Sequence, residues 1–227
     1  MLNDVLSARK SLFDSGTHTE LRGQLNRSRR VVLLSGNVVQ NSRSDISGVS
    51  ARVYRNGTYG FSSMAEYTPE AAEKVLLAAT ENAAFMDSHA GLGKPALPAL
   101  KRDSYRISED IHDPAQKIYI DFTKALDAYI SEHYPQLTIR TIVATEDSME
   151  KLLVTSDSMD SHTILPRSYC YVIMTAQTPD GNPVELYQVF GGEGTFDLNF
   201  TDPSACYPKI DELYGSRAAV PGDRCTV

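Results

Sequence analysis

One group of residues in this sequence has the types and spacing that could bind a metal ion. Asp157, Asp160 and His162 lie close together in the chain, and carboxylate and imidazole groups are common metal ligands. A bend could bring the three donors together, but the Ser, Asp and Met residues of this stretch also form ordinary turns. Asp157, Asp160 and His162 are therefore the place to look for a site made by this chain alone.

Other patterns match only parts of known motifs. His18-Thr19-Glu20 resembles half of a zinc-deaminase signature, without its Pro-Cys-x-x-Cys partner. Residues 48–52 lack the second glycine of a nucleophile elbow. Neither a Lys-Ser/Thr pair nor a helix start follows the glycine-rich residues 191–194, as a phosphate loop would require. Glu146-Asp147 is expected in a turn, where water keeps both carboxylates ionised. These patterns predict no catalytic or metal-binding residue.

The densest basic stretch runs from Arg22 to Arg30 and is expected to surround a hairpin turn. It could grip a phosphate or an acidic peptide, or it could be a solvated sheet edge. The chain as a whole has 29 acidic and 22 basic residues and a formal charge of -7. Such a balance does not attract polyanions, so nucleic acid is not an expected partner.

Cysteine content and hydropathy indicate a cytoplasmic protein. Cys170, Cys206 and Cys225 are widely spaced and odd in number, which argues against a disulfide framework and favours a reducing compartment. Residues 1–15 contain charged side chains where a secretory signal would be apolar, and no apolar run reaches the length of a membrane span. We therefore expect neither export nor a membrane partner.

The elements expected from periodicity and turn signals place the chain in the α+β class. Helices are expected in 2–13, from Thr68-Pro69, from Asp113-Pro114 and in 209–214. Strands are expected at 20–25, 30–34, 38–42, 49–54, 59–62, 137–145, 151–155, 168–177 and 184–190. Gly36-Asn37 and Asn56-Gly57 signal hairpins.

These elements predict antiparallel sheets flanked by helices, arranged as a duplicated helix-meander-helix unit. The first half would be residues 1–90 and the second 113–227. Residues 91–112, rich in Gly and Pro, would connect them.

One segment, 48–63, has a specific pattern: Gly48-Val49, Arg52-Val53, Asn56-Gly57 and Tyr59-Gly60-Phe61-Ser62-Ser63. It resembles the amino-terminal domain of the TldD/PmbA metalloprotease family, described as modulators of DNA gyrase. The resemblance also includes Glu20-Leu21-Arg22, Gly36-Asn37-Val38, Ser44, the Thr68 helix, Ser156-Asp157, Gly191-Gly192 and residues 219–222. It departs at Ser50 and Ser158, where the family often has Gly.

The resemblance implies a hydrolase of which this chain is the front part, truncated before the metal-binding domain. The family's His-Glu-x-x-x-His motif is missing from residues 1–227, so no catalytic or metal-binding residue is carried over and the chain alone is expected to be inactive. Zinc is implied for the full-length family member, and no cofactor is expected in this chain. The implied role is to enclose an unfolded peptide substrate and to dimerise.

The implied partners are the peptide substrate and a second subunit, in a homodimer or in a heterodimer with a paralogue. Tyr54, Tyr59 and Phe61 are the candidate contacts with peptide or partner, or else core residues. Some paralogues lack the metal motif, so an alternative is a non-catalytic interaction module or an inactive paralogue that assembles with an active partner. An exposed apolar patch without a cleft would favour that alternative.

Overall fold

The computed structural model describes residues 2–98, 104–108, 112–178 and 180–216. They form two compact units, each assembled from three stretches of chain. Unit 1 comprises 1–26, 45–109 and 149–165, and unit 2 comprises 27–44, 110–148 and 166–227. Cys225 and residues 219–222 lie outside the described residues.

Runs of consecutive strands are separated by helices, as is typical of the α+β class, so the predicted fold class is confirmed. In chain order the elements are α1 (Leu2–Ser7), η1 (Lys10–Leu12), β1 (His18–Leu34), β2 (Asn37–Arg55), β3 (Thr58–Met64), α2 (Pro69–Ala90), β4 (Arg106–Ser108), α3 (Gln116–His133), β5 (Ile139–Thr155), β6 (Asp160–Gln177), β7 (Pro183–Glu193), α4 (Phe196–Asn199), η2 (Pro203–Cys206) and α5 (Tyr207–Ser216).

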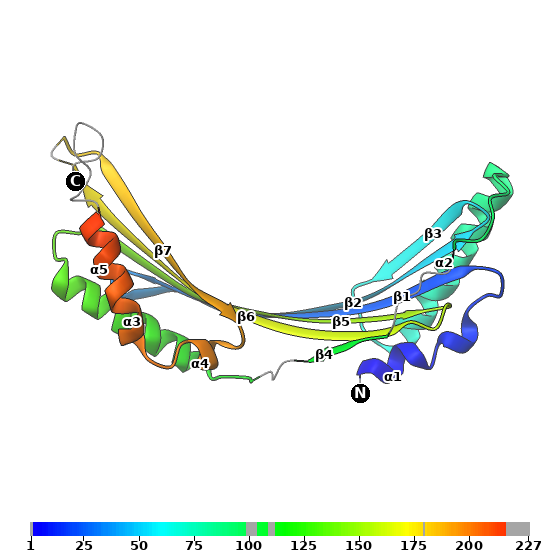
Figure 1. Cartoon of the computed structure of the whole chain (residues 1–227), viewed down its shortest axis with the longest axis horizontal. Helices are drawn as coiled ribbons and strands as arrows, with labels where there is room; N and C mark the ends of the chain where they lie inside the picture. Colours follow the sequence, from blue (N-terminus) through cyan, green and yellow to red (C-terminus); the bar gives the residue numbers. More distant parts are fainter. Residues whose placement is uncertain (1, 99–103, 109–111, 179, 217–227) are drawn as a thin grey trace. The chain divides into compact units, whose positions relative to one another are not determined.

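Unit 1 is a sheet in the order β3-β2-β1-β5-β6-β4, with α2 packed against β3 (Figure 1). The β2–β3 hairpin turns at Asn56 and Gly57, whose φ values of 48° and 101° suit a tight primed turn. The short strand β4 pairs with β6 in parallel. Thr68 caps α2 by accepting a hydrogen bond from the Ala71 N–H at 3.1 Å.

The core of unit 1 lies between its sheet and α2. Alternate strand residues and one stripe of α2 supply it, including Leu21, Val53, Leu152, Val75 and Leu76. At Gly60 the helix approaches the strand so closely that an added Cβ would lie 2.0 Å from the Ala79 carbonyl oxygen. The sheet face opposite α2 carries the polar partners of this alternation.

In unit 2 the strands follow the order β2-β1-β5-β6-β7, and α3 and α5 lie side by side (Figure 1). Their core contains Val31, Leu126, Ile142 and Val172. Cys170 and Cys206 belong to it as free, buried thiols, and burial raises the pKa of Cys206 to about 11.

Several expected turns are instead parts of long strands. Residues 20–25 and 30–34 belong to β1, so Arg27 and Arg30 lie within a strand and Arg29 is buried. The two strands expected at 137–145 and 151–155 likewise form one strand, β5, which runs through Glu146-Asp147. The prediction of a turn at Glu146-Asp147 was therefore wrong. Glu146 is buried and accepts hydrogen bonds from the Tyr119 hydroxyl at 2.8 Å and the Phe196 N–H at 2.6 Å.

The expected duplication is not confirmed. The expected division into 1–90, 91–112 and 113–227 follows chain order, whereas both compact units are discontinuous. The difference arises because β1, β2, β5 and β6 each contribute residues to both units. Among the described residues, no helix is both long and apolar enough to cross a membrane.

Candidate functional site

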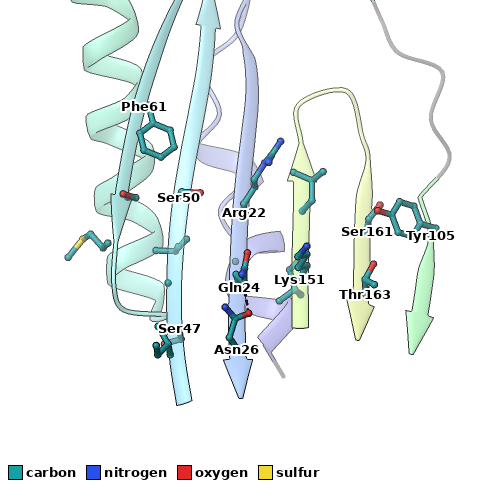
Figure 2. Close-up of a pocket in the computed structure, with 18 residues that line it drawn as sticks. Arg22, Gln24, Asn26, Ser47, Ser50, Phe61, Tyr105, Lys151, Ser161 and Thr163 are labelled. Carbon is teal, nitrogen blue, oxygen red and sulfur yellow. Dashed lines mark hydrogen bonds between the residues drawn. The ribbon is translucent and has the colours of Figure 1, made fainter. Parts of the chain in front are cut away.

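The uncovered face of the unit 1 sheet holds an open groove of about 630 Å³. Side chains from all six strands of this sheet, or from residues next to them, line the groove, as Figure 2 shows. The labelled lining residues are Arg22, Gln24, Asn26, Ser47, Ser50, Phe61, Tyr105, Lys151, Ser161 and Thr163. We call this surface the unit 1 groove.

Strand alternation places these side chains in the groove. In β1, Arg22 and Gln24 are exposed, whereas Leu21 and Gly23, which alternate with them, are buried on the α2 side. Gly23 is required there, because an added Cβ would lie 2.0 Å from the Tyr67 ring. The apolar residues that hold α2 therefore alternate with the polar residues that line the groove.

The groove has a one-sided charge. Among the described residues, Arg22 and Lys151 are the charged residues that line it, and no carboxylate does. Glu20 lies beside the groove on β1 and accepts hydrogen bonds from Arg22 at 2.6 Å and Arg52 at 2.8 Å. Partial burial acts to raise the pKa of Glu20, but its hydrogen bonds with Arg52 and Arg22 outweigh this effect, and the pKa is lowered.

Hydroxyl and amide groups supply most of the remaining polar lining. Gln24 donates a hydrogen bond to Asn26 at 3.0 Å along the groove floor. Ser161 is 3% exposed, and its Oγ has no hydrogen-bond partner among the described residues. In Figure 2 the Ser161 side chain lies next to Tyr105. The groove is therefore rich in hydrogen-bond donors.

The three predicted contact residues lie in different environments. Tyr54 is buried, and its hydroxyl donates to the Pro95 carbonyl oxygen at 2.8 Å. Its ring meets that of Tyr59 edge to face at 5.1 Å. Tyr59 is exposed, and the Arg52 guanidinium lies 5.7 Å from its ring centroid. Phe61 is 59% exposed and lines the groove.

The candidate metal ligands are engaged separately. Asp160 bonds to Ser7 at 3.2 Å and pairs with Arg106 at 3.0 Å, contacts within unit 1. His162 pairs with Glu150 at 2.9 Å, and Asp157 accepts a hydrogen bond from the Thr155 hydroxyl. Across the described residues, no three or more His, Cys, Asp or Glu side chains gather as a metal site.

The incomplete motifs serve local structure. His18 and Glu20 are 3.6 Å apart, an ion pair if the imidazole is protonated. Ser50 lines the groove. Gly191, at φ 142°, belongs to β7, where an added Cβ would lie 2.2 Å from the Ser168 carbonyl oxygen. A close strand approach therefore explains Gly191.

Sequence reasoning missed Lys151 and Ser161 as groove residues. Lys151 reaches the groove because β5 lies beside β1, a pairing between distant parts of the sequence. Ser161 and Thr163 reach it through the adjoining β6. The alternation of Arg22, Gln24 and Asn26 with smaller or apolar residues was the local signal that could have identified the groove face.

Comparisons with known proteins identify the fold of the chain and a family match for residues 19–83. Residues 19–83 match the family model described as PmbA/TldA metallopeptidase domain 1. No curated protein sequence matches the chain.

Three solved structures share the fold at low sequence identity. TldE from Thermococcus kodakarensis is 12% identical with a TM-score of 0.67, covering 94% of this chain and 47% of its own. A proposed modulator of a DNA gyrase from Thermotoga maritima is 13% identical, with a TM-score of 0.65. The match covers 95% of this chain and 47% of the Thermotoga chain. A second proposed modulator, from Bacteroides thetaiotaomicron, is 11% identical, with a TM-score of 0.59. The match covers 92% of this chain and 48% of the Bacteroides chain.

The chain thus spans about half the length of these solved structures. Their TM-scores show a shared fold, and at these low identities they show the fold alone. The family model adds a sequence match over the β1 to α2 region. Residues 19–83 thus match domain 1 of the PmbA/TldA metallopeptidase family, and the chain shares the fold of TldE and of the two proposed gyrase modulators.

Proposed function

We propose that this chain is the substrate-enclosing amino-terminal domain of a TldD/PmbA-type zinc metalloprotease that acts on unfolded peptides. The observation that carries the proposal is the unit 1 groove, an open, donor-rich surface on the uncovered sheet face. An extended peptide offers one carbonyl acceptor per residue, and the donors of such a surface can bind these main-chain groups. Phe61 adds an exposed apolar contact for a substrate side chain.

The proposal places peptide cleavage elsewhere in the full-length protein. The family model is named for a metallopeptidase, but the described residues do not fit a zinc ion, because they gather no group of three or more ligands. We assign no catalytic step to them. In this proposal the chain holds and orients substrate in the cytoplasm, and a homodimer or a heterodimer with a paralogue closes the space around it.

Peptide binding by the purified chain tests the proposal. A fluorescein-labelled, uncharged, unfolded peptide should bind with an anisotropy change that saturates. Phe61→Ala should weaken binding roughly five- to tenfold, as expected for losing part of an aromatic contact. The matched control is Phe85→Ala, because Phe85 is 60% exposed, close to the 59% of Phe61, but lies on α2.

The same two variants should be compared in the full-length gene product. With an unfolded protein such as casein as substrate, Phe61→Ala should raise KM and leave kcat and zinc content unchanged. Equal binding by the Phe61 and Phe85 variants, or no peptide binding at all, would contradict the proposal.

The alternative is an interaction module or inactive paralogue that assembles with an active partner. The exposed apolar residues of α2, Leu77, Phe85 and Met86, are the observation that favours it. It predicts that the full-length product cleaves nothing alone, and that Phe85→Ala weakens partner capture while Phe61→Ala does not. The two variants therefore separate the alternatives.

A further inference from the structure

We infer that the unit 1 groove selects extended peptides that carry an acidic side chain, with an apolar side chain about three residues away. This inference rests on the proposed function and specifies the class of peptide. Three features of the groove support it: its charge, the availability of its donors, and the distance between its cationic and aromatic parts.

The groove's charge is opposite to that of the chain. The whole sequence has 29 acidic and 22 basic residues, yet the part of the chain that the structure describes lines the groove with Arg22 and Lys151 and with no Asp or Glu. A concave surface with one sign of charge attracts ligands of the other sign and repels like-charged ones. The complementary ligand is therefore anionic.

Both cations can accept a further carboxylate. Lys151 is exposed and has no hydrogen bond or ion pair with any described residue. Arg22 uses Nη2 for Glu20, and the same carboxylate also serves Arg52 at 2.8 Å. One acidic group thus balances two guanidinium groups, and Arg22 retains donors directed away from Glu20.

Neutral donors complete the environment of a carboxylate. Ser50, Ser63, Ser161 and Thr163 line the groove, and hydroxyls can donate to an anion without introducing a competing negative charge. The Ser161 Oγ is buried and has no hydrogen-bond partner among the described residues, so its hydroxyl brings no competing acceptor to the groove. Donors without carboxylates favour an acidic side chain over a basic one.

The distance between Arg22 and Phe61 sets the peptide pattern. Arg22 lies on β1 and Phe61 on β3, with β2 between them. Two strand spacings are about 10 Å. A peptide extended in the polyproline II conformation advances about 3.1 Å per residue and presents every third side chain on the same side. A peptide crossing the strands would therefore place an acidic and an apolar residue about three positions apart.

Three labelled peptides of equal length test the inference on the full chain. All are amidated and contain one Phe; the first carries Glu three residues from it, the second Gln at that place, and the third Glu adjacent to Phe. We expect the first to bind about tenfold more tightly than the second at low salt, and the difference to shrink with added salt. The third should bind more weakly than the first.

Charge reversal locates the effect. Lys151→Glu and Arg22→Glu should each remove the preference for Glu over Gln. The matched control is Lys74→Glu, because Lys74 is an exposed lysine on α2. Thermal unfolding of each variant establishes that it is folded, and Lys151→Gln, which removes charge without adding repulsion, should reduce the preference by an intermediate amount.

The outcomes separate this inference from the proposed function. If the Gln peptide binds as tightly as the Glu peptide, the acidic preference is refuted while peptide binding stands; if neither binds, both fail. A preference that requires a free C-terminal carboxylate, tested with non-amidated Gln peptide, would overturn the side-chain assignment. Tighter binding of a single-stranded oligonucleotide at the same salt would overturn the peptide assignment.

Discussion

The Gly60→Ala substitution tests how α2 is held on the sheet that carries the groove. A Cβ at this position would lie 2.0 Å from the Ala79 carbonyl oxygen and 2.4 Å from the Ala83 nitrogen. Both are backbone atoms, so no side-chain rotation can relieve the overlap, and α2 must move by more than about 1 Å to restore van der Waals contact.

The expected cost follows from two opposing effects. Overpacking a well-packed core costs about 1–3 kcal/mol, and the backbone overlap places Gly60→Ala near the upper end. Replacing Gly by Ala also restricts the unfolded chain, which recovers about 0.4–1 kcal/mol. We therefore expect a net loss of about 2 kcal/mol. The matched control is Gly192→Ala, because an added Cβ there meets nothing within 4 Å.

Hydrogen exchange of the α2 amides, read by mass spectrometry, is the assay because it reports on unit 1 specifically. Gly60→Ala should accelerate exchange over Pro69–Ala90 about thirtyfold, the factor that corresponds to 2 kcal/mol. Gly192→Ala should leave it unchanged. A change of less than about threefold in the Gly60 variant would refute the close approach of α2 to β3.

Three further predictions concern buried or paired groups. Glu146→Ala should lower the free energy of unfolding by about 3 kcal/mol, because the buried Tyr119 hydroxyl and Phe196 N–H lose their acceptor. Urea titrations followed by circular dichroism measure this loss. A loss below about 1 kcal/mol, the value of one neutral hydrogen bond, would contradict the prediction. Cys206, whose pKa is raised to about 11, should not react with a thiol reagent at about pH 8 until the protein unfolds. Because the pKa of Glu20 is lowered, its stabilisation is present above the unfolded value near 4.5 and is lost as pH falls through the folded pKa, so wild type and Glu20→Gln should converge in stability in acid.

Local sequence signals predicted the parts of this fold that local interactions determine. Thr68-Pro69 and the apolar stripe after it predicted α2, which begins at Pro69 with Thr68 as its cap. Asn56-Gly57 predicted the β2–β3 turn. The first hairpin was misplaced by one residue, since Ser35 and Gly36 take the positive φ values of 43° and 86°.

Long-range pairing determined what the sequence left unpredicted. Glu146-Asp147 has the composition of a turn, yet Glu146 is buried because Tyr119 and the Phe196 N–H provide hydrogen bonds from distant segments. Arg29 is likewise buried against Asp113 and the Pro114 carbonyl oxygen. Such partners cannot be read from neighbouring residues, and β1 and β5 were therefore each divided in two.

The groove residues show the same difference between local sequence signals and long-range strand pairing. Phe61 was predicted as a contact with peptide or partner from its place in a recognised segment, and the structure shows that it is exposed and lines the groove. Lys151 was not considered, because its significance depends on the strand order that brings β5 next to β1. A single lysine on a polar strand face has no local feature that distinguishes it from a solvated surface residue.

Strand alternation also makes fold and binding separable by experiment. Leu21 and Gly60 face α2, whereas Arg22 and Phe61, their immediate neighbours, face the groove. Because neighbours on a strand point to opposite faces, a substitution at Arg22 or Phe61 removes no contact with α2 and should leave α2 exchange unchanged. Substitution of Gly60 should instead alter both α2 exchange and peptide binding, since displacement of α2 shifts the strand that holds Phe61. Substitutions at adjacent strand positions should therefore have different effects on stability and on peptide affinity. This difference would not be expected if mobile loops formed the groove.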